Sequence, residues 1–310
     1  QIREVCQKLN MEIDDTMGKG KLIDEKKEAS LAYSIQKVKG EELTRMKEVN
    51  MITALAGKAA GVQINKNSSG IGGSAKVSLR GIRSASGDNQ PLYVIDGVPM
   101  LNIGTEQAYS AIGGTANAGN RDGGDGISNL NPEDVESISI LKGAPAAALY
   151  GSQAANGVIL ITTKKGNTAG QRNIHFSTGL TFDKAFSLPK MQNCYGVSDV
   201  VDSWGEKAYL PTSNELNDFF RTGLTSITSV SVNYGNEKIQ TYFSYANTTG
   251  RGIVDKNQLT KHNINLRETA VMFNQRLKLD GNVNVMRQIV KNKPVSGGFY
   301  MNPLVGLYRF

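Results

Sequence analysis

Cysteine and histidine, on which many metal sites and catalytic triads depend, are scarce in this sequence of 310 residues. Cys6 and Cys194 lie far apart and outside any Cys-x-x-Cys spacing, so they could pair in an oxidising compartment or remain two free thiols. His175 and His262 are the two histidines, and no cluster with metal-ligand spacing surrounds either. We therefore expect neither an enzyme nor a protein with a metal or cofactor site.

Long apolar runs are also absent. No stretch of about 18 apolar residues occurs, so no transmembrane helix is predicted. β-Barrels cross bilayers with alternating strands, which a search for apolar runs does not detect. Proline (8 residues) and tryptophan (1) are few, whereas glycine (34) is abundant, and this composition favours many turns between short strands over a helical bundle.

The charge does not point to a particular partner. The formal net charge is +7, but lysine and arginine are spread along the whole chain. No basic block interleaves with aromatic residues, so we expect a solvated basic surface and no nucleic-acid partner. Residues 1–32, which include EIDDTMGKGKLIDEKKE, are charged and predict a flexible lead-in.

Residues 33–166 alternate strand and helix patterns, which predicts one α+β unit with a mixed sheet of about four or five short strands. A helix is expected over residues 41–57, and a tight turn at Asp96-Gly97. The run VILITT, which follows Asn156-Gly157, is apolar throughout and requires burial on both faces. The expected strands are AYSIQKVKG, VQINKN, KVSLRGI, PLYVIDGVP, ESISILKG and VILITTKKG.

A polar, glycine-rich insertion over residues 101–126 is of the kind that carries function in loops. We interpret it as a loop that faces a substrate. A disordered loop is the alternative, and a calcium site is the least favoured because only a fragment of the acidic pattern is present. The candidate residues are Asn117, Asn120, Arg121, Asp122 and Asp125.

After residue 166 the pattern changes to long strands joined by hairpin turns, and residues 167–310 form the third region. In the last clear strand, Leu277, Leu279, Val283 and Val285 alternate with Lys278, Asp280, Asn282 and Asn284. Such alternation is typical of a barrel with lipid outside and water inside. It also fits a soluble sandwich strand with one wet face.

The order of several blocks resembles a known family. The segment VESISILKGAPAAALYGSQAANGVILITTKKG is similar to the plug domain of TonB-dependent transporters. The blocks LAGKAAGVQI, VSLRG, QPLYVIDGVP, NPEDVESI and ANGVILITTKKG, in that order, resemble the SusC-like (SusC/RagA) branch found in Bacteroidota. The later segments SVNYGNEKIQTYFSYANTTGRGIV and NPLVGLYRF are similar to the first barrel hairpins of that branch.

The resemblance implies a fold: an α+β plug domain followed by antiparallel strands of an incomplete transmembrane β-barrel. It also implies a function, namely active import of a large nutrient across the outer membrane, with the plug gating the barrel and accessible from the periplasm. A strand of TonB would pair with a segment within residues 11–30, and TonB would then pull on this segment to displace part of the plug. A SusD-like surface lipoprotein and an oligosaccharide or peptide substrate are the other implied partners, besides outer-membrane lipid.

Two arginines follow the strand KVSL. The resemblance implies that Arg80, with Arg83 beside it, docks against barrel carboxylates and holds the plug in place through charge-assisted hydrogen bonds. The alternative is a solvated arginine at a strand end.

Two rival classes remain. One is a soluble α+β or all-β ligand-binding or adhesin module, and the other is a hydrolase that uses carboxylates of the insertion. A plugged barrel needs about 22 strands, so we expect these residues to belong to a much longer chain. In the barrel interpretation, Leu277, Leu279, Val283 and Val285 point away from the plug, whereas in a soluble module they pack against it.

Overall fold

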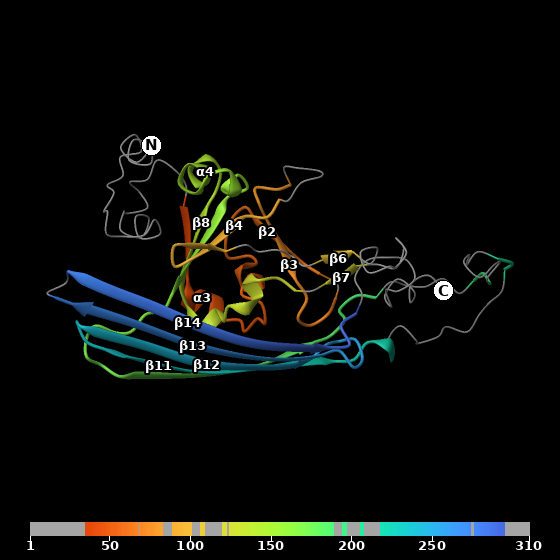
Figure 1. The fold of residues 1–310 in the computed structure, drawn as a ribbon. Coiled ribbons are helices and arrows are strands. Elements are labelled where there is room, and N and C mark those ends of the chain that lie inside the picture. The colour runs from red at the N-terminus through yellow and green to blue at the C-terminus, as the bar shows by residue number, and fades with distance from the viewer. Residues whose placement is uncertain are drawn as a thin grey trace.

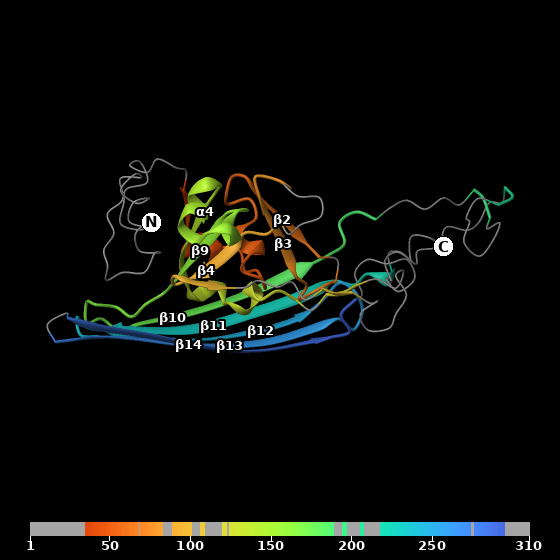
Figure 2. The ribbon, with the colours of Figure 1, turned by 45° about the horizontal axis from the view of Figure 1, so that its top comes forward.

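The computed structural model places the two halves of the chain side by side (Figures 1 and 2). An N-terminal unit, residues 35–166, lies on one face of a long antiparallel sheet, residues 173–291. The structure describes residues 35–67, 69–82, 89–100, 106–108, 120–122, 124–188, 194–196, 205–207, 218–273 and 276–294.

The N-terminal unit is built on a five-stranded mixed sheet in the order β1-β8-β9-β4-β5. The β4 and β9 strands are parallel, and the other neighbours are antiparallel. A pair formed by β2 and β3 and another formed by β6 and β7 complete its strands. The strands are β1 Ile35–Lys39, β2 Val62–Lys66, β3 Ala75–Leu79, β4 Leu92–Ile95, β5 Val98–Met100, β6 Glu106–Ala108, β7 Asn120–Asp122, β8 Val135–Leu141 and β9 Val158–Thr163.

The helices of this unit are short. The α4 helix lies at the end of the unit far from the long sheet, whereas α3 lies close to it (Figures 1 and 2). The helices and 3-10 turns are α3 Gly40–Thr44, η2 Thr53–Leu55, η5 Ile127–Asn129, η6 Pro132–Asp134, α4 Ala144–Tyr150 and η7 Ser152–Ala154.

The apolar run VILITT forms β9 and is buried on both faces, as predicted. Ile159 and Ile161 belong to the main core, whereas Val158 and Leu160 pack on the opposite side with Ala146 of α4. Two cores on either side of one strand explain why this strand has no polar face.

The helix expected over residues 41–57 is wrong in its length. The α3 helix ends at Thr44, and only the single turn η2 follows within that range. The side chain of Asn50 accepts a hydrogen bond from the Ile52 backbone N–H at 2.9 Å. A local bond of this kind competes with helical pairing, and Met46, which the helix would have placed on its apolar stripe, is exposed.

The long sheet contains five antiparallel strands in sequence order, β10 to β14. Each strand pairs with the next over most of its length, and no register shift interrupts these pairings. The five described strands curve gently beside the N-terminal unit without closing into a barrel (Figure 1). Their bounds are β10 Asn173–Asp183, β11 Gly223–Gly235, β12 Ile239–Arg251, β13 Gln258–Met272 and β14 Leu277–Lys291.

The fold class expected from the sequence is confirmed: a mixed α+β unit precedes antiparallel strands. In the described part of the chain, no helix has both the length and the apolar character to cross a membrane.

Candidate functional site

The candidate site is the contact between the N-terminal unit and the long sheet. The face of the sheet that meets the unit is polar and buried, which is the reverse of a soluble core. Its buried polar residues include Thr225, Ser229, Ser244, Thr248, Lys261, Asn263, Asn265, Arg267 and Thr269.

The opposite face of the long sheet is apolar and exposed. Its large side chains include Ile174, Phe176, Leu180, Phe182, Phe243, Ile264, Leu266, Leu277, Leu279, Val283, Val285 and Ile289. The last strand has the predicted directions: Asp280 pairs with the buried Arg267, whereas Val283 and Val285 lie opposite the outward-facing Leu266 and Ile264 of β13. This arrangement does not favour the binding-module alternative, in which the apolar side chains would pack against the N-terminal unit.

Arg267 of β13 joins the two parts of the structure. Its guanidinium donates to both carboxylate oxygens of Asp280 on β14, through Nε at 2.9 Å and Nη2 at 2.8 Å. Its Nη1 donates to Asp96 Oδ2 at 2.9 Å and to Thr163 Oγ1 at 2.5 Å, both in the N-terminal unit. Only 5% of the arginine side chain is exposed, so its charge depends on these partners.

A second contact joins Asp134, at the end of η6, to β12. The Tyr242 hydroxyl donates to Asp134 Oδ1 at 3.0 Å, and both residues are buried. Burial raises the pKa of Asp134, although the hydrogen bond from Tyr242 and the nearby Lys164 charge oppose the rise. The folded structure therefore favours the protonated form of this carboxyl more than the unfolded chain does.

Two side chains of β13 bind the carbonyl groups at the end of η5. Lys261 Nζ donates to the Ser128 carbonyl at 2.5 Å, and Asn263 Nδ2 donates to the Asn129 carbonyl at 2.6 Å. These carbonyls have no partner within the short helix, so the long sheet satisfies them.

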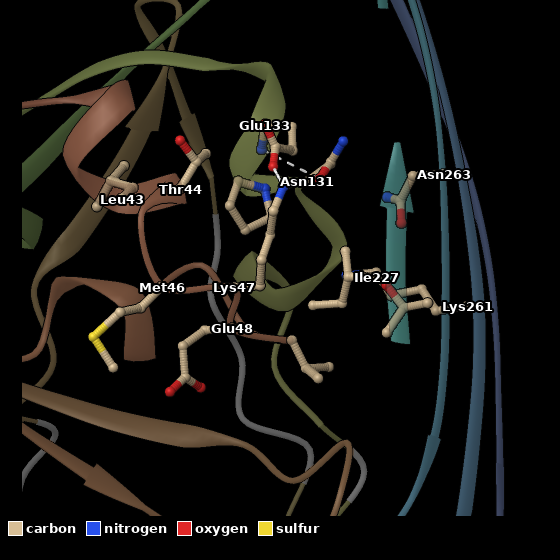
Figure 3. Close-up of a pocket in the computed structure, with 13 residues that line it drawn as sticks. Leu43, Thr44, Met46, Lys47, Glu48, Asn131, Glu133, Ile227, Lys261 and Asn263 are labelled. Carbon is tan, nitrogen blue, oxygen red and sulfur yellow. Dashed lines mark hydrogen bonds and ion pairs between the residues drawn. The ribbon is translucent and has the colours of Figure 1, made fainter. Parts of the chain in front are cut away.

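A pocket lies beside this contact, between α3, η6 and the inner face of the sheet (Figure 3). Lys47 crosses it and pairs with Glu133 while also donating to Ser177 of β10. Burial, and to a lesser degree the Lys164 charge, lowers the pKa of Lys47. The pocket is lined by Leu43, Thr44, Met46, Lys47, Glu48, Val49, Asn131, Pro132, Glu133, Ile227, Thr248, Lys261 and Asn263.

Asp122 of the insertion is buried and bonded to the segment before β3 and to a lysine beyond β14. Its carboxylate accepts from Ser69 Oγ at 2.6 Å, Ser74 N at 2.7 Å and Gly124 N at 2.7 Å, and it pairs with Lys293 beyond β14 at 3.3 Å. Burial acts to raise the pKa of Asp122, but these hydrogen bonds and Lys293 lower it to about 2.

Asp125 is buried in a similar way. Its carboxylate accepts from Ala75 N and Ser128 N, both at 2.8 Å, and from Asn50 Nδ2 at 3.2 Å. In this structure, the two carboxylates on which a hydrolase would depend therefore position the insertion against β3 and η5. Both side chains are buried.

The other candidate residues of the insertion are not brought together by the described structure. Asn120 and Arg121 lie in β7, which pairs with β6. Their side chains, and Asn117 as a whole, lie outside the described residues. The interpretation of this loop as substrate-facing stays a prediction for these three residues.

Arg80 is exposed at the end of β3, where its backbone φ is +61°. Among the described residues, no Asp or Glu forms an ion pair with it. Lys142 is nearby, and burial together with the Arg80 charge lowers the pKa of that lysine. Arg83 lies outside the described residues.

Sequence reasoning did not identify Arg267, Asp96 or Asp134 as contact residues. The available signal was that polar and charged side chains alternate with apolar ones along β13. No pattern in the sequence shows which partner each of them meets, because Arg267 and Asp96 are 171 positions apart. The described residues also include no group of three or more His, Cys, Asp or Glu that could hold a metal ion.

Comparison with known proteins agrees with this architecture. Residues 27–158 match the family model of the TonB-dependent Receptor Plug Domain. The chain is 32% identical to TonB-dependent receptor SusC of Bacteroides thetaiotaomicron, over 84% of this chain and 25% of the relative. It is 27% identical to TonB-dependent receptor P26 of Formosa agariphila, over 84% of this chain and 26% of that protein.

Among solved structures, the RagAB peptide importer in its closed-closed state matches with a TM-score of 0.63 and 21% identity. The match covers 84% of this chain and 31% of the RagAB chain. At this identity the likeness concerns the fold. The chain spans about a quarter of the length of the curated relatives named above.

Proposed function

The chain belongs to the TonB-dependent receptor family, and we propose that it contributes the gating plug and part of the barrel of a transporter that imports large nutrients across the outer membrane. In this proposal residues 1–32 are the lead-in that contacts TonB, residues 33–166 are the plug domain and residues 167–310 provide the first barrel strands. The plug is reached from the periplasm.

One observation carries the proposal: the long sheet presents a buried polar face to the N-terminal unit and an exposed apolar face away from it. A sheet in contact with lipid requires this arrangement, since its outer side chains meet hydrocarbon and its inner ones meet water or a plug. A plug held by polar contacts can separate from such a sheet without exposing a large apolar surface to water.

We propose TonB as the source of energy. The outer membrane has no nucleotide supply, so the force must come from a partner that is energised elsewhere. Strand addition to the lead-in would connect TonB directly to β1, which lies at the edge of the five-stranded sheet and, among the described strands, pairs only with β8. Pulling on the lead-in would therefore act first on the β1–β8 pair.

The proposed substrate is an oligosaccharide or a peptide, and the proposed surface partner is a SusD-like lipoprotein. Support comes from the similarity to SusC and from the fold shared with RagAB, which is described as a peptide importer. The insertion residues Asn117, Asn120 and Arg121 are the proposed substrate contacts within this chain.

We also propose that Arg80, with Arg83, contacts the barrel and helps to hold the plug. The Arg80 side chain is exposed beside the like-charged Lys142, and a barrel carboxylate that approached it would be attracted by both charges. If Arg80→Ala in the full-length protein transports and retains its plug like the wild type, Arg80 has no such role.

The function is tested by uptake in cells that express the full-length protein. Uptake of labelled oligosaccharides and peptides is compared in cells with and without TonB, and in a variant lacking residues 1–32. Uptake of one substrate class should be lost in both cases while the amount of protein in the outer membrane is unchanged. Uptake that persists without TonB would refute the proposed mechanism.

A further inference from the structure

Arg267 contacts the long sheet and the N-terminal unit at the same time, and it does so with separate nitrogen atoms. Nε and Nη2 bind Asp280 of the same sheet, and Nη1 binds Asp96 and Thr163 of the N-terminal unit. These residues, Arg267, Asp280, Asp96 and Thr163, are the Arg267 cluster.

We propose that the Arg267 cluster is a reversible contact that holds the plug and that leaves no unpaired buried charge on either side when the plug moves away. The proposal rests on the plug function proposed above. It assigns the holding arginine to the sheet, whereas Arg80 and Arg83 belong to the plug.

On the sheet side, the pairing with Asp280 is bidentate. Two parallel N–H···O bonds fix the plane of the guanidinium and maintain a charge partner that does not depend on the plug. Lys165 of the N-terminal unit lies farther from Asp280, with 3.9 Å between its Nζ and Oδ2, so Arg267 is the main charge partner of this carboxylate. When the plug separates, Arg267 loses its Nη1 contacts and keeps Asp280.

On the plug side, Asp96 has its own partners. Its Oδ1 accepts from the Thr163 backbone N–H at 3.0 Å, and its Oδ2 accepts from the Thr163 hydroxyl at 2.6 Å. The carboxylate therefore stays hydrogen-bonded and in position after Arg267 is withdrawn. Removing one partner of a buried ion pair is costly mainly because the other charge is left alone, and this cluster avoids that cost on both sides.

The two carboxylates should consequently have opposite effects on separation. Asp96→Asn removes the ion pair that exists only while the plug is docked, so it should make separation easier. Asn keeps the turn, because it tolerates the φ of +48° at this position. Asp280→Asn removes the partner that Arg267 keeps after separation, so it should make separation harder.

The experiment measures how often the plug leaves the sheet in the full-length protein in detergent. Cys6 and Cys194 are replaced by serine, and Ala246→Cys is introduced on β12. Ala246 is buried on the plug-facing side of the sheet, so a water-soluble maleimide should reach a cysteine there only when the plug has moved. Labelling is followed in urea below the concentration that unfolds the barrel, and heat-modified gel mobility confirms that each variant is folded.

We expect Asp96→Asn to label about tenfold faster, because a hydrogen-bonded charge pair of the docked state is lost. Asp280→Asn should label more slowly than the parent, by roughly threefold or more. Asp255→Asn is the matched control: this carboxylate pairs with Arg221 within the strand connections and should leave labelling unchanged.

Changes in the same direction for Asp96→Asn and Asp280→Asn would overturn the proposal, because they would indicate only a loss of general stability. Unchanged labelling of Asp96→Asn would also overturn it, even if Asp280→Asn failed to fold. The assay needs neither TonB nor substrate, so its failure is distinguishable from failure of the import function.

Discussion

At the scale of single residues, the pKa values of the two buried carboxyls Asp122 and Asp134 shift in opposite directions, although burial acts to raise both. Asp122 accepts three hydrogen bonds and pairs with Lys293, which lowers its pKa to about 2 despite burial. For Asp134 burial outweighs the opposing hydrogen bonds and the Lys164 charge, and its pKa is raised. The ionised form of Asp122 therefore stabilises the folded structure, whereas ionisation of Asp134 destabilises it.

This difference predicts how stability depends on pH. An unfolded aspartate has a pKa of about 3.9. The contribution of Asp122 is therefore fully present above about pH 4 and is lost as the pH falls towards 2. Asp134 acts with the opposite sign, because a raised pKa favours the folded state at low pH and this advantage is lost as the pH rises.

Substitution by asparagine separates the two residues at pH 7. Asp122→Asn should lower the free energy of plug unfolding by about 2 kcal/mol or more, since it loses charge-assisted bonds and introduces a donor among donors. Asp134→Asn should change this free energy little, because the amide oxygen can still accept from Tyr242. Urea unfolding of the plug within the full-length protein measures both. Equal losses would contradict the assignment.

At the scale of elements, the strands were predicted well and the helix was not. Strand positions follow from alternation and from turn residues such as Asp96-Gly97, and both signals are local. The helix predicted over residues 41–57 is shorter in the structure, where the Asn50 side chain accepts a hydrogen bond from the Ile52 backbone N–H and so competes with helical pairing. Contacts between elements, such as that of Arg267 with Asp96, depend on the assembled fold and could not be predicted from the sequence.

The turn into β9 offers a prediction at this scale. Gly157 has a φ of +101°, and a Cβ there would lie 2.6 Å from Leu79 Cδ1 and 2.9 Å from the Leu141 carbonyl oxygen. Gly151 also has a positive φ, +77°, but a Cβ there would meet nothing within 4 Å. Gly151→Ala therefore tests backbone strain alone, and Gly157→Ala tests strain together with steric overlap.

We expect Gly151→Ala to cost about 1–2 kcal/mol of plug stability. Gly157→Ala should cost about 3 kcal/mol or more, because overpacking adds to the strain. Urea unfolding of the plug in the full-length protein compares the two variants. If both alanines cost the same, β9 does not pack as closely on β3 and β8 as the structure shows.

At the scale of the whole molecule, the defining property is the polarity of the long sheet. A soluble sandwich buries its apolar face and exposes its polar one, and here the order is reversed. The alternation in β14 predicts that the sheet has one apolar face and one polar face. The sequence alone could not decide which face would meet the N-terminal unit, because alternation is the same in both cases.

The neighbouring residues Asn265 and Leu266 of β13 allow the most direct test of this account. Asn265 is 1% exposed on the face towards the N-terminal unit, and Leu266 is 45% exposed on the opposite face. Spin labels are placed at each position in turn in the full-length protein, reconstituted in lipid bilayers. Their collision rates with oxygen, which is concentrated in lipid, and with a water-soluble nickel chelate are then compared.

The account predicts that the label at Leu266 collides with oxygen and hardly with the nickel chelate, since this face meets lipid. The label at Asn265 should collide little with either reagent while the plug is docked. A label at Leu266 that is shielded from oxygen, or open to the nickel chelate, would contradict the central claim that the apolar face of the sheet lies against the membrane and the plug lies on its polar face.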